Sequence, residues 1–183
     1  MPNAIVLLDF DGVINRITSR NHATTSAHRR PAEVFADPRR DHLSIDGSEY
    51  PIIWSPRQID ALRDVAEASD ATWRWCTTWD RHTPNIEHLM HIDWMSGFEP
   101  VPDPMTQEAA KSQAVRRAVA QANLVAWIDD AYAHPLPEWT VEREADRTAH
   151  CTCDGARVLT IAPDETDGLT VAQVGALAEF LGA

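Results

Sequence analysis

The chain has 183 residues, a length typical of one domain with its own hydrophobic core. Its composition is ordinary for a globular protein, with 44% hydrophobic and 24% charged residues, and its net charge of -12 disfavours nonspecific binding to phosphate backbones. No segment reaches the roughly 18 apolar residues of a membrane span, and the apolar run at residues 4–8 is too short for a signal-peptide core. The three cysteines do not form an even disulfide framework, so we expect a cytoplasmic protein with reduced thiols and no membrane partner.

The first third of the chain predicts a strand, an irregular insert and a hairpin. Residues 4–9 read as a buried strand, whereas residues 14–42 are polar, aperiodic and locally rich in arginine. Residues 43–54 predict a hairpin around the turn signal Asp46-Gly47. The segment Ser55-Pro56-Arg57-Gln58 then predicts a helix start with a capping box made by the side chains of Ser55 and Gln58.

Strands and helices continue to alternate through the rest of the chain. The predicted elements are a strand at 71–77, a helix at 83–90, a proline-rich loop at 100–104, a helix at 106–121, a strand at 124–129, a polar helix at 135–150, a strand at 157–161 and a helix at 170–181. A second capping box, Thr170 with Gln173, opens the last helix. This alternation predicts a single α/β domain, residues 1–183, with a doubly wound parallel sheet covered on both faces.

Three of the predicted strands end in side chains that are capable of chemistry. These strand-end pairs are Asp9 with Asp11, Thr77 with Thr78, and Asp129 with Asp130. Ligands of an open parallel sheet bind outside the carboxyl ends of its strands, so we expect the pairs to form one cluster. Strand alternation places Asp9 and Asp11 on the same side, and Gly12 allows the chain to turn sharply after them. Such an oxygen-rich site suits Mg²⁺, which binds one or two carboxylates and keeps positions open for water and phosphate oxygens.

The order of these motifs resembles that of the haloacid dehalogenase (HAD) superfamily. It runs from Asp9-Phe10-Asp11-Gly12 through the strand-end Thr77 and the helix-borne Lys111, the single lysine of the chain, to the apolar strand that ends in Asp129-Asp130. The resemblance implies a Rossmannoid core and a Mg²⁺-dependent phosphatase that works through an aspartyl-phosphate. It also implies that Asp9 is the nucleophile and Asp11 the general acid and base. Thr77 would hold the phosphate, and Lys111 would neutralise its charge.

The same resemblance implies the metal ligands and the substrate contacts. The implied metal ligands are Asp9, Asp11 through its backbone carbonyl, Asp129 and Asp130. The implied substrate contacts are Gly12, Thr78 and Trp79. The resemblance does not decide which of the adjacent residues Thr77 and Thr78 holds the phosphate. Dehalogenation is disfavoured, because that reaction needs neither a metal nor the protonating group that Asp11 supplies.

A narrower resemblance connects the chain with small HAD domains attached to predicted RNA-repair enzymes of bacteria and phages. It rests on Trp75-Cys76-Thr77-Thr78-Trp79 with Asn85 downstream, and on Tyr50-Pro51-Ile52 ahead of Ser55-Pro56. Residues 14–54 are too short for a full cap domain, so this resemblance implies a small cap or flap insert and an open active site. An open site suits a polymer end as well as a nucleotide.

Several alternatives remain open from the sequence. The substrate is either a nucleotide or other phosphorylated small molecule, which the net charge favours, or a terminal phosphate of a nucleic acid, which the arginines of residues 16–40 favour. Those arginines form either a solvated loop or a phosphate-binding rim. A noncatalytic HAD-like binding or regulatory domain is the alternative of a different class. His88 and His91 are expected to be surface or packing residues rather than metal ligands, and no segment indicates an obligate protein partner.

Overall fold

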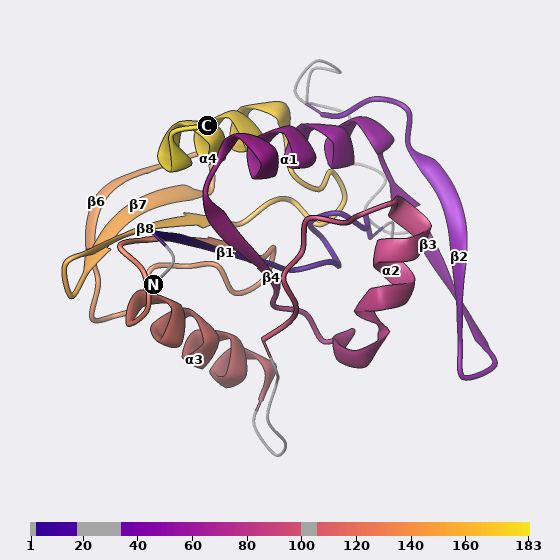
Figure 1. The fold of residues 1–183 in the computed structure, drawn as a ribbon, viewed down its shortest axis with the longest axis horizontal. Coiled ribbons are helices and arrows are strands. Elements are labelled where there is room, and N and C mark those ends of the chain that lie inside the picture. Colours follow the sequence, from indigo (N-terminus) through magenta and orange to yellow (C-terminus); the bar gives the residue numbers. More distant parts are fainter. Residues whose placement is uncertain (1–2, 18–33, 100–105) are drawn as a thin grey trace.

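The computed structural model describes residues 3–17, 34–99 and 106–183. Six strands form a central sheet in the order β4-β1-β5-β8-β7-β6, and two more form a separate hairpin (Figure 1). The strands are β1 Ala4–Leu8, β2 Arg39–Ile45, β3 Ser48–Trp54, β4 Ala71–Trp75, β5 Leu124–Ile128, β6 Thr140–Ala145, β7 Thr148–Cys153 and β8 Ala156–Ile161. The helices are α1 Pro56–Ala68, α2 Thr83–Met90, α3 Gln107–Val119 and α4 Val171–Leu181, and a 3-10 turn, η3, spans Asp80–His82.

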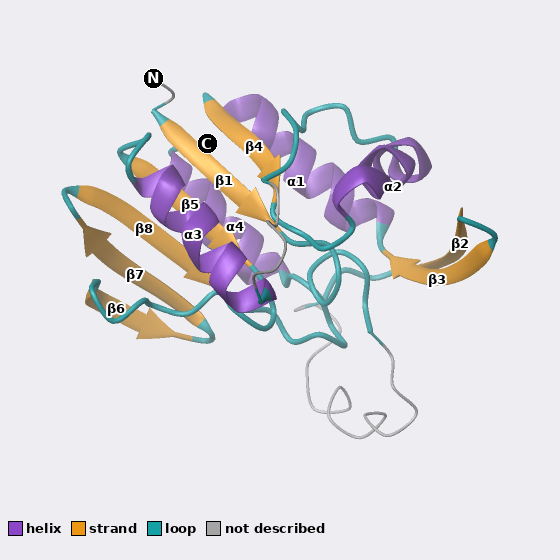
Figure 2. Cartoon of the chain, turned by 90° about the horizontal axis from the view of Figure 1, so that it is seen from below, coloured by secondary structure: helices purple, strands orange, loops and turns teal. Residues whose placement is uncertain are grey.

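The central sheet is mostly parallel and has helices on both faces. Strands β4, β1, β5 and β8 run parallel, whereas β7 and β6 continue the sheet antiparallel. Helices α1 and α4 cover one face and α3 covers the other (Figures 1 and 2). This arrangement confirms the predicted doubly wound α/β fold, with two antiparallel strands added at one edge.

Strand β1 lies inside the sheet and is buried along its whole length. Val6 and Leu8 pack in the core under α1 and α4, while Ile5 and Leu7 point to the opposite face and pack with Val115 of α3. A strand that is buried on both faces reads as a continuous apolar run, which explains why β1 and β5 could be recognised from the sequence. Their burial fixes the backbone from which the strand-end acids project.

The predicted polar helix at residues 135–150 is wrong. The structure has strands β6 and β7 there, joined by a two-residue turn in which Asp146 and Arg147 both have positive φ angles, 50° and 60°. Every residue of β6 is exposed, so this strand needs no apolar face and carries no alternating hydrophobic signal. The turn also lacks the glycine that usually marks a two-residue hairpin loop. These two features hid the hairpin from sequence analysis.

The capping box predicted at Ser55 is also wrong, although the helix begins at Pro56 as expected. The Ser55 hydroxyl donates a hydrogen bond to the carbonyl of Ala36 at 3.0 Å, and the Gln58 amide donates to the carbonyl of Val13 at 2.7 Å. Both side chains therefore tie the start of α1 to the insert and to the turn after β1. The second predicted capping box, Thr170 with Gln173 at the start of α4, is confirmed.

The hairpin β2–β3 belongs to the segment predicted as an insert and has the expected Asp46-Gly47 turn. It lies apart from the central sheet, next to α2 (Figure 2). A backbone hydrogen bond from the amide of Arg16 to the carbonyl of Ile53, at 2.7 Å, connects the hairpin to the segment that follows β1. The cap role of residues 14–54 and the single-domain organisation stay predictions.

Parts of two predicted segments lie outside the described residues. They include Arg20, Arg29 and Arg30 of the insert and the prolines at 100, 102 and 104. Within the described part of the chain, no helix has the length and apolar character needed to cross a membrane.

Candidate active site

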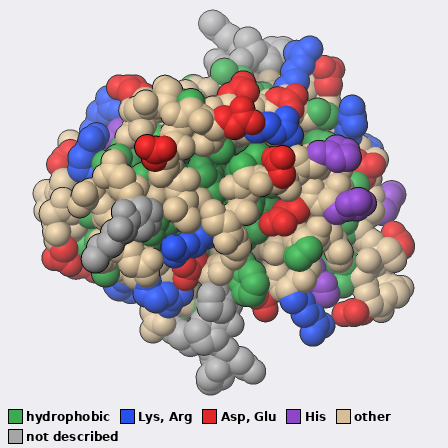
Figure 3. Space-filling model, in the orientation of Figure 1, with side chains coloured by type: hydrophobic (Ala, Val, Ile, Leu, Met, Phe, Trp, Pro, Cys, Tyr) green, Lys and Arg blue, Asp and Glu red, His purple; other side chains and the backbone are tan. Residues whose placement is uncertain are grey.

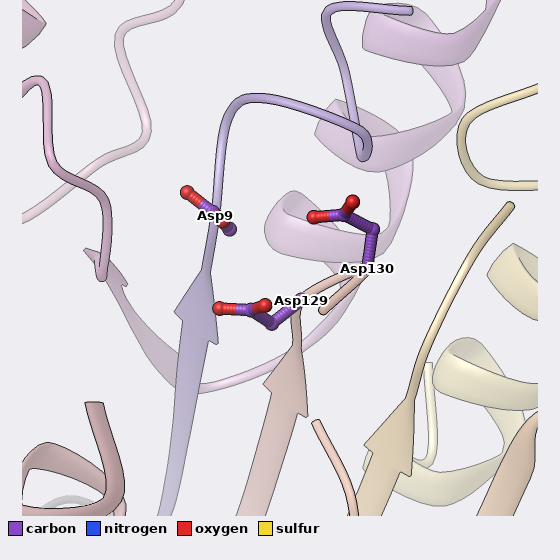
Figure 4. Close-up of side chains that lie close together, drawn as sticks. All are labelled: Asp9, Asp129 and Asp130. Atoms are coloured by element: carbon purple, nitrogen blue, oxygen red, sulfur yellow. The ribbon is translucent and has the colours of Figure 1, made fainter. Parts of the chain in front are cut away.

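The carboxyl ends of β1, β4 and β5 meet at one edge of the sheet. Just past the strands, the amide of Asp9 donates to the carbonyl of Ile128 at 2.9 Å, and the amide of Cys76 donates to the carbonyl of Leu8 at 2.8 Å. Asp9 therefore follows the end of β1, and the Asp129-Asp130 pair follows the end of the neighbouring strand β5. Their carboxylates lie close together above the strand ends (Figure 4). The expected convergence of these two distant segments is what the structure shows.

Three carboxylates form a compact cluster at this edge. Asp9, Asp129 and Asp130 each offer one oxygen, and these oxygens all lie within 4.8 Å of one another. Asp9 and Asp129 are buried, and Asp130 is partly buried. The backbone amides of Ala131 and Tyr132 donate to Asp129 Oδ1 at 3.1 and 2.8 Å, which fixes the orientation of that carboxylate.

Lys111 projects from the first half of α3 into this cluster. Its Nζ lies 2.5 Å from Asp9 Oδ2 and 2.6 Å from Asp129 Oδ2, and the side chain is 3% exposed. The ammonium also lies 5.2 Å from the centre of the Tyr132 ring, a cation–π contact. Burial acts to lower the pKa of Lys111, but the Asp9 and Asp129 carboxylates outweigh it and hold that pKa above its ordinary value. The single lysine of the chain is therefore a fixed positive charge between two of the acids.

The single positive charge of Lys111 does not neutralise the negative charges of three carboxylates. Burial, followed by repulsion from Asp129, raises the pKa of Asp9 to about 7, although Lys111 and the backbone amide of Phe10 oppose the shift. Burial and Asp129 likewise raise the pKa of Asp130 to about 6. The cluster thus holds more negative charge than its own residues neutralise. Because its donors are carboxylate oxygens, it fits a hard divalent cation such as Mg²⁺.

Asp11 lies beyond the strand, and its carboxylate does not join the three-acid cluster. Asn15 Nδ2 donates to Asp11 Oδ1 at 2.7 Å, and Trp79 Nε1 donates to Asp11 Oδ2 at 2.8 Å. The carboxylate is therefore held by two side-chain donors. A metal contact through the Asp11 backbone carbonyl stays a prediction.

Gly12 lies where the chain turns back over the cluster. Its φ is +70°, and a Cβ atom built on it would lie 2.2 Å from Cγ of Asp130. Any larger residue would therefore be strained in its backbone and would also displace the Asp130 carboxylate. Gly12 shapes the site by leaving room for an acid.

We expect Gly12→Ala to lower the free energy of unfolding by more than about 1 kcal/mol and to weaken Mg²⁺ binding, because a left-handed alanine is strained and its methyl group pushes against Asp130. Chemical unfolding and a Mg²⁺ titration followed by thermal shift measure the two effects. Gly175→Ala is the matched control: Gly175 lies in α4 with open space around its Cα. That variant should be unchanged or slightly more stable. Unaltered Mg²⁺ affinity in Gly12→Ala would contradict the packing argument.

The two strand-end threonines differ in burial. Thr77 is 2% exposed, and its Oγ1 accepts a hydrogen bond of 3.4 Å from the amide of Trp79, whereas Thr78 is exposed. Trp79 is partly buried, with its ring 5.4 Å from Phe10 and 5.5 Å from Tyr50, both in edge contacts. The phosphate-binding role of either threonine and the substrate contact of Trp79 stay predictions.

Sequence analysis missed two residues that support the site. Asn15 holds Asp11, and Tyr132 contacts both Asp129 and Lys111. Asn15 comes four residues after Asp11, across the turn at Gly12, and this spacing could have predicted their contact. His88 and His91, expected to be surface or packing residues, are both exposed. Cys76 lies next to the acids, but burial raises the pKa of its thiol to about 12, which keeps it protonated.

The parallel core and the acid cluster with its lysine define a domain of the haloacid dehalogenase type. A family model described as "HAD domain in Swiss Army Knife RNA repair proteins" matches residues 5–174 of the chain. The chain belongs to this family of HAD domains. No curated protein and no solved structure gives a significant match.

Proposed function

We propose that the protein is a Mg²⁺-dependent phosphomonoesterase that works through an aspartyl-phosphate on Asp9. The observation that carries this proposal is the meeting of Asp9, Lys111 and Asp129 within hydrogen-bond distance, with Asp130 beside them. A buried carboxylate that is paired with a buried ammonium and surrounded by potential metal ligands suits nucleophilic attack on phosphorus.

In the first step, an Asp9 carboxylate oxygen attacks the phosphorus atom of the ester. A new P–O bond to Asp9 forms while the bond to the leaving oxygen breaks, and Asp11 donates its proton to that oxygen. Lys111 and the hydroxyl of Thr77 stabilise charge on the transferring group. The products are an alcohol and the phosphorylated enzyme.

In the second step, water attacks the phosphorus atom of the aspartyl-phosphate. Asp11, now a carboxylate, takes a proton from that water, and the P–O bond to Asp9 breaks. Inorganic phosphate leaves, Asp9 is regenerated as a carboxylate, and Asp11 is again protonated. One aspartate therefore serves as the acid in one step and the base in the other.

The residues that would hold Mg²⁺ are Asp9, Asp129 and Asp130, together with the backbone carbonyl of Asp11. Bound there, Mg²⁺ would supply positive charge that offsets repulsion among these acids and between them and the phosphate. In the protein alone, the Asp9 pKa of about 7 leaves part of the population protonated at neutral pH.

A terminal phosphate of a nucleic acid is the substrate class that we propose. The family to which the chain belongs is described from RNA repair proteins, and this description supports the proposal. Acidic and basic side chains are intermingled on the face shown in Figure 3, and the net charge is -12. Recognition is therefore proposed to concentrate on the phosphorylated end rather than on a long stretch of backbone.

We expect hydrolysis of 4-nitrophenyl phosphate to stop in excess chelator and to return when Mg²⁺ is added back, because the acid cluster needs a divalent cation to accept a phosphate dianion. Mg²⁺ should also raise the melting temperature of the protein, which provides a readout independent of activity. Asp130→Asn should raise the Mg²⁺ concentration needed for half-maximal effect by about tenfold or more. Full activity in chelator would contradict the metal assignment.

The substrate class is tested by comparing kcat/KM for a nucleoside monophosphate with that for RNA oligonucleotides carrying a 3′ or a 5′ phosphate. A higher value for one of the oligonucleotides supports the nucleic-acid end. Equal or higher values for the mononucleotide would favour a small-molecule substrate. The dependence of each rate on salt concentration shows whether basic side chains contact more than the terminal phosphate.

A further inference from the structure

Both oxygens of the Asp11 carboxylate are bound by side chains that also contact the hairpin β2–β3. Asn15 donates to Oδ1 at 2.7 Å and Trp79 donates to Oδ2 at 2.8 Å. Asn15 follows Asp11 closely in the chain, whereas Trp79 comes from the segment after β4. The two donors therefore hold the carboxylate from separate elements.

The Asn15 side chain connects Asp11 to strand β3. The amide of Ile53 donates to Asn15 Oδ1 at 2.9 Å, so the oxygen of the side-chain amide must face β3. The Nδ2 donor is then directed to the other side, where Asp11 lies. Asn15 is 7% exposed, and the amide of Gly12 donates to its backbone carbonyl at 2.8 Å, which closes the turn that carries both residues. The hairpin thus fixes which end of Asn15 meets the carboxylate.

The Trp79 ring makes a second connection between Asp11 and the same strand. Tyr50 of β3 lies edge-on to Trp79 with 5.5 Å between ring centres, and Phe10, the neighbour of Asp9, lies 5.4 Å away in a similar contact. The indole is placed by two aromatic neighbours, so its N–H has a defined direction toward Asp11. Tyr50 is 43% exposed, which leaves this connection accessible at the surface.

We propose that Asn15 and Trp79 are positioning residues for Asp11, and that the hairpin β2–β3 acts through them to orient the general acid. This inference rests on the proposed phosphatase function. A carboxylate that must give a proton to one oxygen and later take one from water needs a fixed orientation relative to the phosphorus. Two hydrogen bonds, one to each carboxylate oxygen, restrict its rotation. In this proposal the hairpin β2–β3 contributes to proton transfer.

The dependence of the rate on the leaving group distinguishes this role from a structural one. Formation of the aspartyl-phosphate from an alkyl phosphate releases a strongly basic alkoxide and needs a well-placed acid. The same step with 4-nitrophenyl phosphate releases a stable anion and needs little protonation. A residue that acts through Asp11 must therefore affect kcat/KM for the alkyl phosphate far more than for the nitrophenyl ester.

The test uses Trp79→Phe, which keeps an aromatic ring between Phe10 and Tyr50 but removes the N–H donor. We expect kcat/KM for an alkyl phosphate, such as a nucleoside monophosphate, to fall by about tenfold or more, and kcat/KM for 4-nitrophenyl phosphate to fall by less than about threefold. Asn15→Ala, which removes the other donor, should show the same substrate-dependent loss. Trp94→Phe is the matched control, because its indole N–H is buried and has no hydrogen-bond partner among the described residues. It should change neither rate.

A double variant shows whether the effect passes through Asp11. In an Asp11→Asn background, Trp79→Phe should cause no further loss with the alkyl phosphate, since the carboxylate that it orients is already gone. Equal losses on both substrates, or full additivity with Asp11→Asn, would overturn the inference. If the unaltered protein hydrolyses neither ester with Mg²⁺, the proposed function itself fails. The hydrogen bond can still be checked then, because the Trp79 indole N–H resonance should shift in Asp11→Ala.

Discussion

Asp9→Asn is expected to abolish hydrolysis of 4-nitrophenyl phosphate, with a loss of kcat on the order of 10⁴-fold or more, because an amide oxygen is a poor nucleophile. The fold should remain intact, since asparagine has nearly the same shape and can still accept the hydrogen bond from the Phe10 amide at Oδ1. Lys111 keeps Asp129 as its partner. Steady-state kinetics and thermal unfolding measure the two outcomes.

A matched substitution and a phosphate analogue complete this test. Asp64→Asn makes the same chemical change at an exposed position of α1 and should leave the rate unaltered. Beryllium fluoride with Mg²⁺ should inhibit the unaltered protein by occupying Asp9 and should not bind to Asp9→Asn. Unchanged turnover in Asp9→Asn would end the nucleophile assignment. Absence of both activity and analogue binding in the unaltered protein would favour a noncatalytic HAD-like domain.

Lys111→Met is expected to remove activity and also to destabilise the metal-free protein by about 3–5 kcal/mol, because it leaves two buried carboxylates without their shared cation. Burial and Asp129 raise the pKa of Asp9 to about 7 even with Lys111 present, and Lys111 acts to lower it. Folded Asp9 is therefore neutral well below pH 7 with or without Lys111, and the destabilisation should deepen as the pH rises through about 7, where Asp9 ionises beside Lys111 in the unaltered protein but has no cation beside it in the variant. Chemical unfolding at several pH values, in chelator, measures this dependence.

The control for Lys111→Met is a double variant that removes the negative charge of Asp129 together with the positive charge of Lys111. Lys111→Met combined with Asp129→Asn should recover much of the lost stability, because fewer buried charges remain unpaired, yet it should stay inactive. A stability of Lys111→Met equal to that of the unaltered protein, at every pH, would show that the three charges do not interact as their distances indicate.

The strands that carry the site could be predicted because burial on both faces makes them continuous apolar runs. The Asp9 and Asp129 acids follow such runs directly, and the rule that ligands bind at the carboxyl ends of parallel strands brings them together. Lys111 was indicated by the order of motifs, and its Nζ lies between those acids. Local pattern and topology were sufficient for this part of the molecule.

Other features depend on contacts that leave no local signal. Trp79 and Asp11 are 68 positions apart in the chain, so their hydrogen bond is visible only after the fold has formed. Ser55 has the sequence of a helix cap, but the carbonyl of Ala36 provides another partner for its hydroxyl. Strand β6 reads as polar helix because every one of its residues is exposed and it has no regular apolar alternation. In each case, tertiary contacts override what the neighbouring residues favour.

Strand β6 is the outermost strand of the described sheet, so one side of its backbone faces water. Such an edge can recruit a strand from another molecule and begin aggregation. Here the residues Glu142, Arg143 and Glu144 place charges along the edge, and the pairing with β7 is irregular between Val141 and Arg143. Both features disfavour the addition of a further strand. The exposed strand that carries no apolar signal in the sequence is therefore also a strand whose charges and irregular pairing disfavour contact between copies edge to edge.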